Sequence, residues 1–134
     1  MKYLDSNVFI LPVLYQGKKA KKAKKILTDM VEGKKDYATS SLTFDEIVWA
    51  IMKIKDRDKA ILVGKDFICL PNLKILDVKE RHLLNSLELL EKYPNLKPRD
   101  AIHISVSISS GIFTIISDDT DFENIPEINR EKID

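Results

Sequence analysis

Three carboxylates stand within four residues, directly after an apolar run near the end of the chain. The run, residues 112–116 (Ile-Phe-Thr-Ile-Ile), is short, β-branched and introduced by Gly111, which is typical of a buried strand. Asp118, Asp119 and Asp121 follow it at once. Like charges this close repel, most strongly where water is scarce. A folded chain therefore either spreads them into solvent as a turn or neutralises them with a cation.

Length and composition indicate one soluble domain over residues 1–134. The chain is 44% apolar and 32% charged, enough for one core under an ionic surface. We find no apolar run long enough to cross a bilayer, and an acid at Asp5 argues against a secretory signal. The single cysteine, Cys69, lies in the apolar stretch 67–70, so we expect it to be buried. These features predict a cytoplasmic protein without membrane contacts.

Short apolar runs alternate with amphipathic segments along the whole chain. We expect strands at 2–4, 36–40, 73–76 and 112–116, with a further short one from Ile128, and helices at 6–11, 18–31, 43–52, 56–70, 78–92 and 98–109. This order predicts a three-layer α/β/α fold with a central parallel sheet of four to five strands, which is Rossmann-like.

The segment 98–109 is ambiguous, because its apolar residues are two apart, as in a strand. A proline at its start, a glycine at its end and its length favour a helix. In the helix 56–70, the candidates for burial are Ile61, Leu62, Phe67 and Ile68.

Two helix starts carry local capping signals. Ser6 or Asn7 can cap the first helix, which is expected to break near Pro12. Thr43 and Glu46 have the spacing of a capping box, which gives Glu46 a purely structural explanation.

The predicted helix 18–31 has two different faces. Ala20, Ala23 and Leu27 share its apolar side, and six lysines occupy the other side (Lys18, Lys19, Lys21, Lys22, Lys24 and Lys25). A lysine-rich face is ordinarily a solvated surface. The alternative is contact with phosphates, in which each lysine adds salt-dependent affinity. Because the net charge is only +1, a polyanion would be recognised locally.

Acids recur where predicted strands end and predicted helices begin. Asp5 follows the first strand and Asp119 the fourth, whereas Glu46 and Asp100 lie near helix starts. In an open parallel sheet these places meet on one rim. A helix N-terminus favours one negative charge by only roughly 0.3–1 kcal/mol, so four acids brought together call for a divalent cation. Oxygen ligands without His or Cys favour Mg²⁺ or Mn²⁺.

Four motifs occur in order along the chain. They are residues 4–8 (Leu-Asp-Ser-Asn-Val), Ser41 with Thr43 and Glu46, residues 99–103 (Arg-Asp-Ala-Ile-His) and residues 117–122 (Ser-Asp-Asp-Thr-Asp-Phe). With them the chain resembles the PIN-domain ribonucleases, and within them the small toxin ribonucleases of the VapC type, over nearly its whole length. The resemblance implies a PIN-like fold.

The resemblance also implies roles for individual residues. Metal binding and catalysis fall to four acids, with a fifth supporting the metal (Asp5, Glu46, Asp100 and Asp119, then Asp121). Asn7, Ser117 and Asp118 would be supporting neighbours. Two alternatives stay open: Asp118 in place of Asp119, and Asp45 in place of Glu46, although the spacing favours Glu46. For His103 we favour a packed or hydrogen-bonded role, and His82 receives no role.

The expected activity is that of a Mg²⁺- or Mn²⁺-dependent endoribonuclease that leaves 5′-phosphate and 3′-hydroxyl ends. The candidate RNA-binding residues are Lys18, Lys19, Lys22 and Arg99. By resemblance the protein is the toxin of a toxin–antitoxin pair, a homodimer whose cognate antitoxin covers the acidic rim. The alternatives are an RNA-processing nuclease outside such a pair and a catalytically silent protein-binding module. A receiver-type phosphoacceptor fits poorly, because only one acid follows the first strand.

Overall fold

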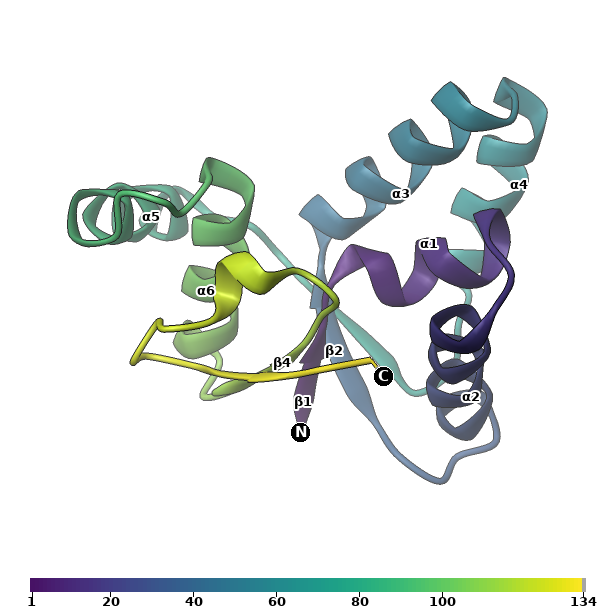
Figure 1. Cartoon of the computed structure of the whole chain (residues 1–134), viewed down its shortest axis with the longest axis horizontal. Coiled ribbons are helices and arrows are strands. Elements are labelled where there is room, and N and C mark those ends of the chain that lie inside the picture. The colour runs from purple at the N-terminus through teal and green to yellow at the C-terminus, as the bar shows by residue number, and fades with distance from the viewer. Residues whose placement is uncertain (134) are drawn as a thin grey trace.

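Five short strands form a parallel sheet through the middle of the molecule in the computed structural model, which describes residues 1–133 (Figure 1). The strands are β1 (Lys2–Leu4), β2 (Tyr37–Ser40), β3 (Leu73–Leu76), β4 (Thr114–Ile116) and β5 (Asn129–Glu131), in the spatial order β3-β2-β1-β4-β5. The helices are α1 (Ser6–Leu14), α2 (Lys18–Val31), α3 (Ser41–Ile54), α4 (Arg57–Ile68), α5 (Glu80–Lys92) and α6 (Pro98–Ser109), with a 3₁₀ turn, η1 (Thr120–Phe122).

Alternate side chains of the strands supply two separate cores. In β1, Tyr3 packs into the core that α5 and α6 cover, whereas Leu4 packs into the core beneath α1 to α4. Ile115 and Ile116 of β4 divide in the same way. This is the two-residue period of a strand that is buried on both faces. The predicted three-layer α/β/α fold is therefore confirmed, with α5 and α6 on one side of the sheet and α1 to α4 on the other (Figure 1).

The ambiguous segment is a helix, α6, as predicted. Gly111 ends it with a φ of +74°, a left-handed conformation that glycine adopts without a Cβ penalty. The Ser107 hydroxyl then donates to the carbonyl of Ile112 at 2.7 Å, which ties the helix end to the chain leading into β4. This turn sets where the acids after β4 fall.

The first helix differs from the prediction at both ends. Asp5 is its N-cap, and the Asp5 carboxylate accepts from the Ser6 amide at 2.8 Å, so neither Ser6 nor Asn7 has that role. The helix also continues through Pro12 to Leu14. Proline is tolerated there because only two further helical residues follow it, so little of the hydrogen-bond ladder depends on the turn that it disturbs.

The burial expected for α4 is largely wrong. Phe67 is buried, but Ile61, Leu62 and Ile68 are exposed, and so is Cys69 directly after the helix. The buried face of α4 instead consists of two small residues, Ala60 and Gly64, together with Phe67. A Cβ built on Gly64 would lie 3.1 Å from Val48 Cγ2, so glycine lets α4 approach α3 closely.

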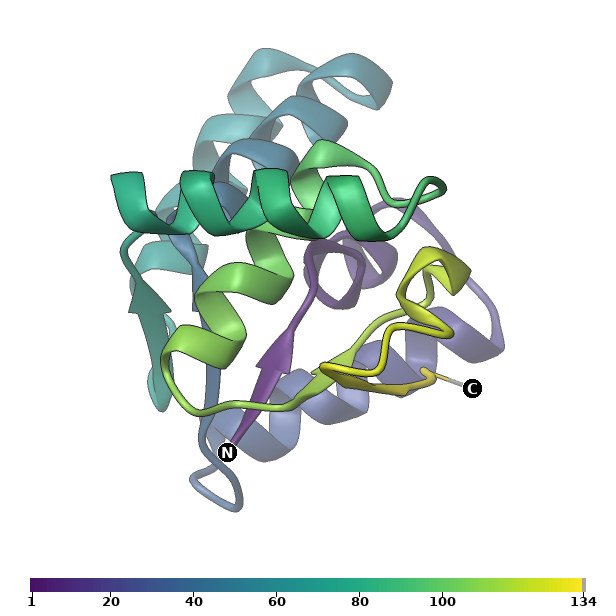
Figure 2. The same cartoon turned by 90° about the vertical axis from the view of Figure 1, so that its left-hand side faces the viewer.

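The sheet order creates a topological switch point. From the central strand β1 the chain moves outward to β2 and β3 on one side, and later fills β4 and β5 on the other. Ligand sites of open parallel sheets form at such a reversal, outside the carboxyl ends of the strands. Figure 2 shows β1 leading directly into α1 at this end of the sheet. Residues that follow β1 and β4 therefore meet there.

We predict that Gly111→Ala lowers the free energy of unfolding by about 1–2 kcal/mol, because an L-residue must adopt the left-handed conformation. Space is not the cause, since a Cβ there would meet no described atom within 4 Å. Urea unfolding measures the loss. Ser110→Ala is the control, because Ser110 is exposed and has a φ of −96°; an equal loss in both variants would contradict the explanation.

Candidate active site

The candidate site lies at the switch point between β1 and β4. Asp5 follows β1 directly, and its amide donates to the carbonyl of Ile116 in β4 at 3.1 Å. Ser117, Asp118 and Asp119 follow β4. The end of β1 and the end of β4 are thus tied together, and the predicted acids on these two segments become neighbours.

Asp5 is held from several directions. Its side chain is buried, and its Oδ2 accepts from the Ser117 hydroxyl at 2.6 Å and from the Asn7 amide at 3.2 Å. The same hydroxyl accepts from the Asp119 amide at 2.9 Å. Ser117 therefore links the carboxylate after β1 to the backbone after β4. Such hydrogen bonds fix the direction of a carboxylate.

His103 connects Glu46 of α3 to Asp5 on this rim. His103 Nε2 lies 2.5 Å from Glu46 Oε1 and 3.6 Å from Asp5 Oδ1. The other ring nitrogen of His103 is 2.6 Å from the Tyr3 hydroxyl, which donates to Ser40 Oγ at 2.8 Å. His103 is fully buried, and burial alone would lower its pKa; Tyr3, the hydrogen bond to Glu46 and the charge of Asp5 outweigh it and raise the pKa well above its usual value.

Asp100 of α6 completes the rim together with Asp119 and Asp121. One ligand atom from each of these three acids lies within 4.8 Å of those of the other two. A second such group is formed by Asp5, Glu46 and His103. Glu46, Asp100 and Asp119 line the same cleft, of about 600 Å³, so both groups border one space.

The electrostatics of Asp100 are unfavourable in the absence of a cation. Burial, then the charges of Asp119 and Asp5 and, less strongly, Asp121, raise the pKa of the Asp100 carboxyl to about 7, although the charge of His103 opposes them. Its Oδ2 atom is buried and has no hydrogen-bond partner among residues 1–133. A buried, unpartnered carboxylate oxygen is costly. The arrangement thus fits a site that binds a cation.

The donor set fits a hard divalent cation. Five acids supply carboxylate oxygens to the two groups, and three of them, Glu46, Asp100 and Asp119, line one cleft. The one histidine among them is already bonded to Tyr3 and Glu46. Mg²⁺ and Mn²⁺ prefer such oxygen ligands. The acidic cluster could therefore bind a divalent metal ion.

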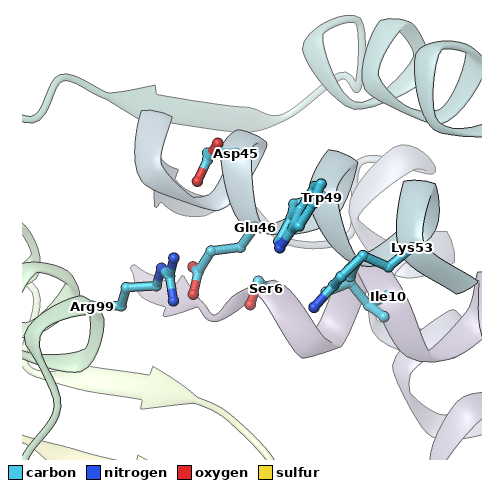
Figure 3. A pocket seen from close by; sticks show the side chains of 8 residues that line it. Ser6, Ile10, Asp45, Glu46, Trp49, Lys53 and Arg99 are labelled. Atoms are coloured by element: carbon cyan, nitrogen blue, oxygen red, sulfur yellow. The ribbon is translucent and has the colours of Figure 1, made fainter. Parts of the chain in front are cut away.

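Cations surround this rim. Lys97 Nζ pairs with Asp121 at 2.8 Å, and Lys19 of α2 pairs with Asp118 at 2.7 Å. Asp118 therefore points to α2, whereas Asp119 faces the cleft. Arg99 lines the cleft and extends toward Glu46 (Figure 3). The exposed Lys18 and Lys22 lie on α2 with Lys19.

Two local predictions for α3 are resolved by these contacts. The capping box of Thr43 and Glu46 is wrong, because the helix begins earlier, at Ser41, and the Glu46 carboxylate bonds to His103. Thr43 instead accepts from the Thr39 hydroxyl at 2.7 Å. Asp45 is exposed on the wall of a neighbouring cleft and does not belong to either group of candidate ligands in the described residues (Figure 3).

Sequence reasoning missed Tyr3 and Ser40 as parts of the site. Tyr3 and Ser40 lie in predicted strands. The hydrogen bonds that connect Ser40 to Tyr3 and Tyr3 to His103 arise only when β1, β2 and α6 pack together. His103 had a sequence signal, since it follows Asp100 by three residues and so shares its helix face. His82 is buried and accepts from the Lys79 amide at 2.9 Å, so it caps α5.

The chain belongs to the PIN-domain family, because the family model of the PIN domain matches its residues 2–128. Two curated relatives are 27% identical over 127 residues, 95% of this chain and 96% of each relative: VapC ribonuclease Mb1869c of Mycobacterium bovis and ribonuclease VapC13 of Mycobacterium tuberculosis.

Solved structures share the fold at low sequence identity. VapBC2 of Rickettsia felis, bound to a promoter DNA fragment, has a TM-score of 0.74 at 19% identity, with 98% of both chains covered. VapC20 of Mycobacterium tuberculosis, a sarcin–ricin loop cleaving toxin, has a TM-score of 0.77 at 14% identity, with 91% of this chain and 92% of that chain covered. Across residues 1–133, no helix is long and apolar enough to span a membrane.

We predict that Asp100→Asn stabilises the metal-free protein at pH 8. The folded-state pKa of about 7 exceeds the ordinary value of 3.8, so the contribution of this carboxyl to stability is complete below about pH 4 and is lost as pH rises through 7. Asparagine does not ionise, so Asp100→Asn should raise the free energy of unfolding at pH 8 by about 1–4 kcal/mol relative to wild type.

Urea unfolding in EDTA at pH 4 and pH 8 checks this prediction. The advantage of Asp100→Asn over wild type should be small at pH 4 and large at pH 8. A variant that is less stable than wild type at pH 8 would show that Asp100 is not electrostatically strained.

Proposed function

We propose that this protein is a Mg²⁺- or Mn²⁺-dependent endoribonuclease that hydrolyses RNA phosphodiester bonds. The observation that carries the proposal is that Glu46, Asp100 and Asp119 line one cleft, with Asp5 grouped beside Glu46 and an unpartnered buried oxygen on Asp100. The PIN-domain family and relatives named as VapC ribonucleases support it.

The acids have separable roles in this proposal. Asp5, Asp100 and Asp119 hold the metal, Glu46 completes the set from α3, and Asp121 supports it from η1. A divalent cation bound there supplies Lewis-acid chemistry, polarising the phosphate and acidifying a water molecule. Ser117 and Asn7 orient Asp5 through the hydrogen bonds described above. A carboxylate not engaged as a ligand accepts the proton of the attacking water.

His103 is a positioning residue in this scheme. Its short contact with Glu46 fixes that carboxylate toward the cleft, and Tyr3 and Ser40 hold the imidazole from behind. Neighbours of this kind set the direction of ligand side chains. The ring itself is buried and does not line the cleft.

The basic residues around the rim supply the attraction for RNA. Arg99 at the cleft and Lys18, Lys19 and Lys22 on α2 are the proposed phosphate contacts. An acidic rim would repel a polyanion, so flanking cations are needed to hold the strand. Of the three α2 lysines, Lys19 pairs with an acid of this region, Asp118, directly after β4.

We further propose that the protein is a cytoplasmic toxin of a toxin–antitoxin pair, a homodimer held inactive by a cognate antitoxin. The fold likeness to VapBC2 of Rickettsia felis and to the VapBC complex of Salmonella typhimurium supports an antitoxin partner. An RNA-processing nuclease outside such a pair would use the same site. A catalytically silent binding module is disfavoured, because it would not require the complete acid set.

We predict that Asp119→Asn abolishes cleavage of single-stranded RNA while Asp118→Asn retains it. Loss of a metal ligand should lower activity by at least about 100-fold, since even neighbours of ligands cost about 10–100-fold. Asp118 is the matched control, with the same side chain one residue away but paired with Lys19.

Cleavage is measured on labelled RNA with Mg²⁺ or Mn²⁺, and again with excess EDTA, which should stop it in wild type. Thermal unfolding with and without Mn²⁺ should show stabilisation of wild type and of Asp118→Asn, and much less in Asp119→Asn. Full activity in EDTA would refute a metal-dependent enzyme.

We predict that the triple variant Lys18→Ala, Lys19→Ala, Lys22→Ala binds RNA more weakly and with a shallower salt dependence. For single strands the slope of log affinity against log salt changes by about 0.7 for each phosphate that the protein no longer neutralises. Lys59→Ala, Lys65→Ala, Lys74→Ala removes the same charge from exposed positions on α4 and β3. Equal slopes in the two triple variants would assign the α2 lysines to an ordinary solvated face.

A further inference from the structure

A second, smaller cleft adjoins the acidic one and has no part in the metal chemistry. Its volume is about 210 Å³, and its walls include Ile10, Asp45, Trp49 and Lys53 (Figure 3). Glu46 and Arg99 line both clefts, so the two spaces meet at these side chains. A molecule bound at the acids is therefore beside the smaller cleft.

Trp49 is not explained by the core of the protein. Its neighbours Ile47 and Ile51 on α3 are fully buried, whereas Trp49 remains 54% exposed. Lys53, one helical turn further on, places its Nζ 5.4 Å from the centroid of the indole ring. A large aromatic surface is thus left open in a cleft, with a cation over the ring.

The walls of this cleft carry two cations, Lys53 and Arg99, and two acids, Asp45 and Glu46. Lys53 and Arg99 are both exposed cations on its walls, and Figure 3 shows Arg99 and Lys53 on opposite sides of the Glu46 and Ser6 region. Aromatic rings flanked by cations bind single-stranded nucleic acid by stacking the bases and neutralising phosphates. The volume is below the roughly 300–1,000 Å³ of pockets for drug-sized ligands, which suits one base.

We infer that this cleft is a base-binding subsite, in which the nucleotide next to the cleaved phosphate stacks its base on Trp49. Arg99, shared by the two clefts, contacts the phosphate between them, and Lys53 neutralises the next one. The inference rests on the proposed nuclease function and extends it to how the strand is held. RNA is favoured over a protein segment because the cleft adjoins the acidic one, and because the two cations, Lys53 and Arg99, lie on both sides of it and offset the charge of Asp45 and Glu46.

The intrinsic fluorescence of the protein tests this directly, because Trp49 is the single tryptophan of the chain. The Asp119→Asn variant with Mg²⁺ is titrated with a single-stranded RNA decamer, and separately with an abasic strand of the same length and charge. We expect saturable quenching by RNA and little by the abasic strand. Equal responses to both strands, or none to RNA, overturn the subsite.

Kinetics on otherwise wild-type protein give a second readout. Trp49→Ala should raise KM for RNA by roughly 5- to 150-fold with a smaller change in kcat, and Trp49→Phe should restore most of the loss. Phe113→Ala is the matched control, since Phe113 is also an exposed aromatic, 57% accessible, and lies outside both clefts. An unchanged KM in Trp49→Ala overturns the inference, and a protein partner would then be the remaining candidate to cover Trp49.

The two proposals fail in distinguishable ways. If wild type cleaves no RNA with Mg²⁺ or Mn²⁺ but base-dependent quenching is seen, the nuclease is refuted and the base-binding site is supported. If wild type cleaves RNA while Trp49→Ala keeps its KM, only the subsite is refuted.

Discussion

Repulsion between carboxylates at the ends of β1 and β4 is the constraint on which the site depends. The structure offsets part of it with hydrogen bonds, since Ser6, Asn7 and Ser117 all donate to Asp5. Another part is offset by His103, which lies between Glu46 and Asp5. Asp100 retains a buried oxygen without a partner in the described chain. The folded protein therefore keeps an acid in an electrostatically unfavourable position, where a bound cation would be stabilising. Sites of function commonly lower the stability of a protein in this way.

The rigid sheet is what makes this strain possible. Each acid comes from an element that is fixed independently: Asp5 from the end of the central strand β1, Asp100 from the first turn of α6, and Asp119 from the segment that Ser117 holds to Asp5. If any of these segments were free to move, the acids would separate and relax. Placing charged groups on packed elements at a switch point is thus both an energetic burden and the basis of a preorganised site.

The sequence carried enough signal for the architecture and for the location of the acids. Alternating short apolar runs and amphipathic segments predicted the parallel sheet, and acids directly after strands had to gather at its carboxyl edge. Prediction failed where tertiary packing overrides local pattern. α4 buries Ala60 and Gly64 rather than Ile61 and Leu62, because close approach to α3 favours small residues. Glu46 had a capping signal, yet its partner is His103, 57 residues away.

The same limit applies to the smaller cleft. In the sequence Trp49 is one more apolar residue of an amphipathic helix, and nothing in its spacing separates it from Ile47 or Ile51. Only the packing of α3 against α1 shows that those two face the core while Trp49 faces a cleft shared with Glu46 and Arg99. Since consecutive turns of α3 carry Glu46, Trp49 and Lys53, one helix faces both clefts. Any rotation of α3 would move Glu46 and the Trp49 ring together. In the proposed complex, the binding of a base at Trp49 is therefore coupled to the position of the RNA phosphate at the acids.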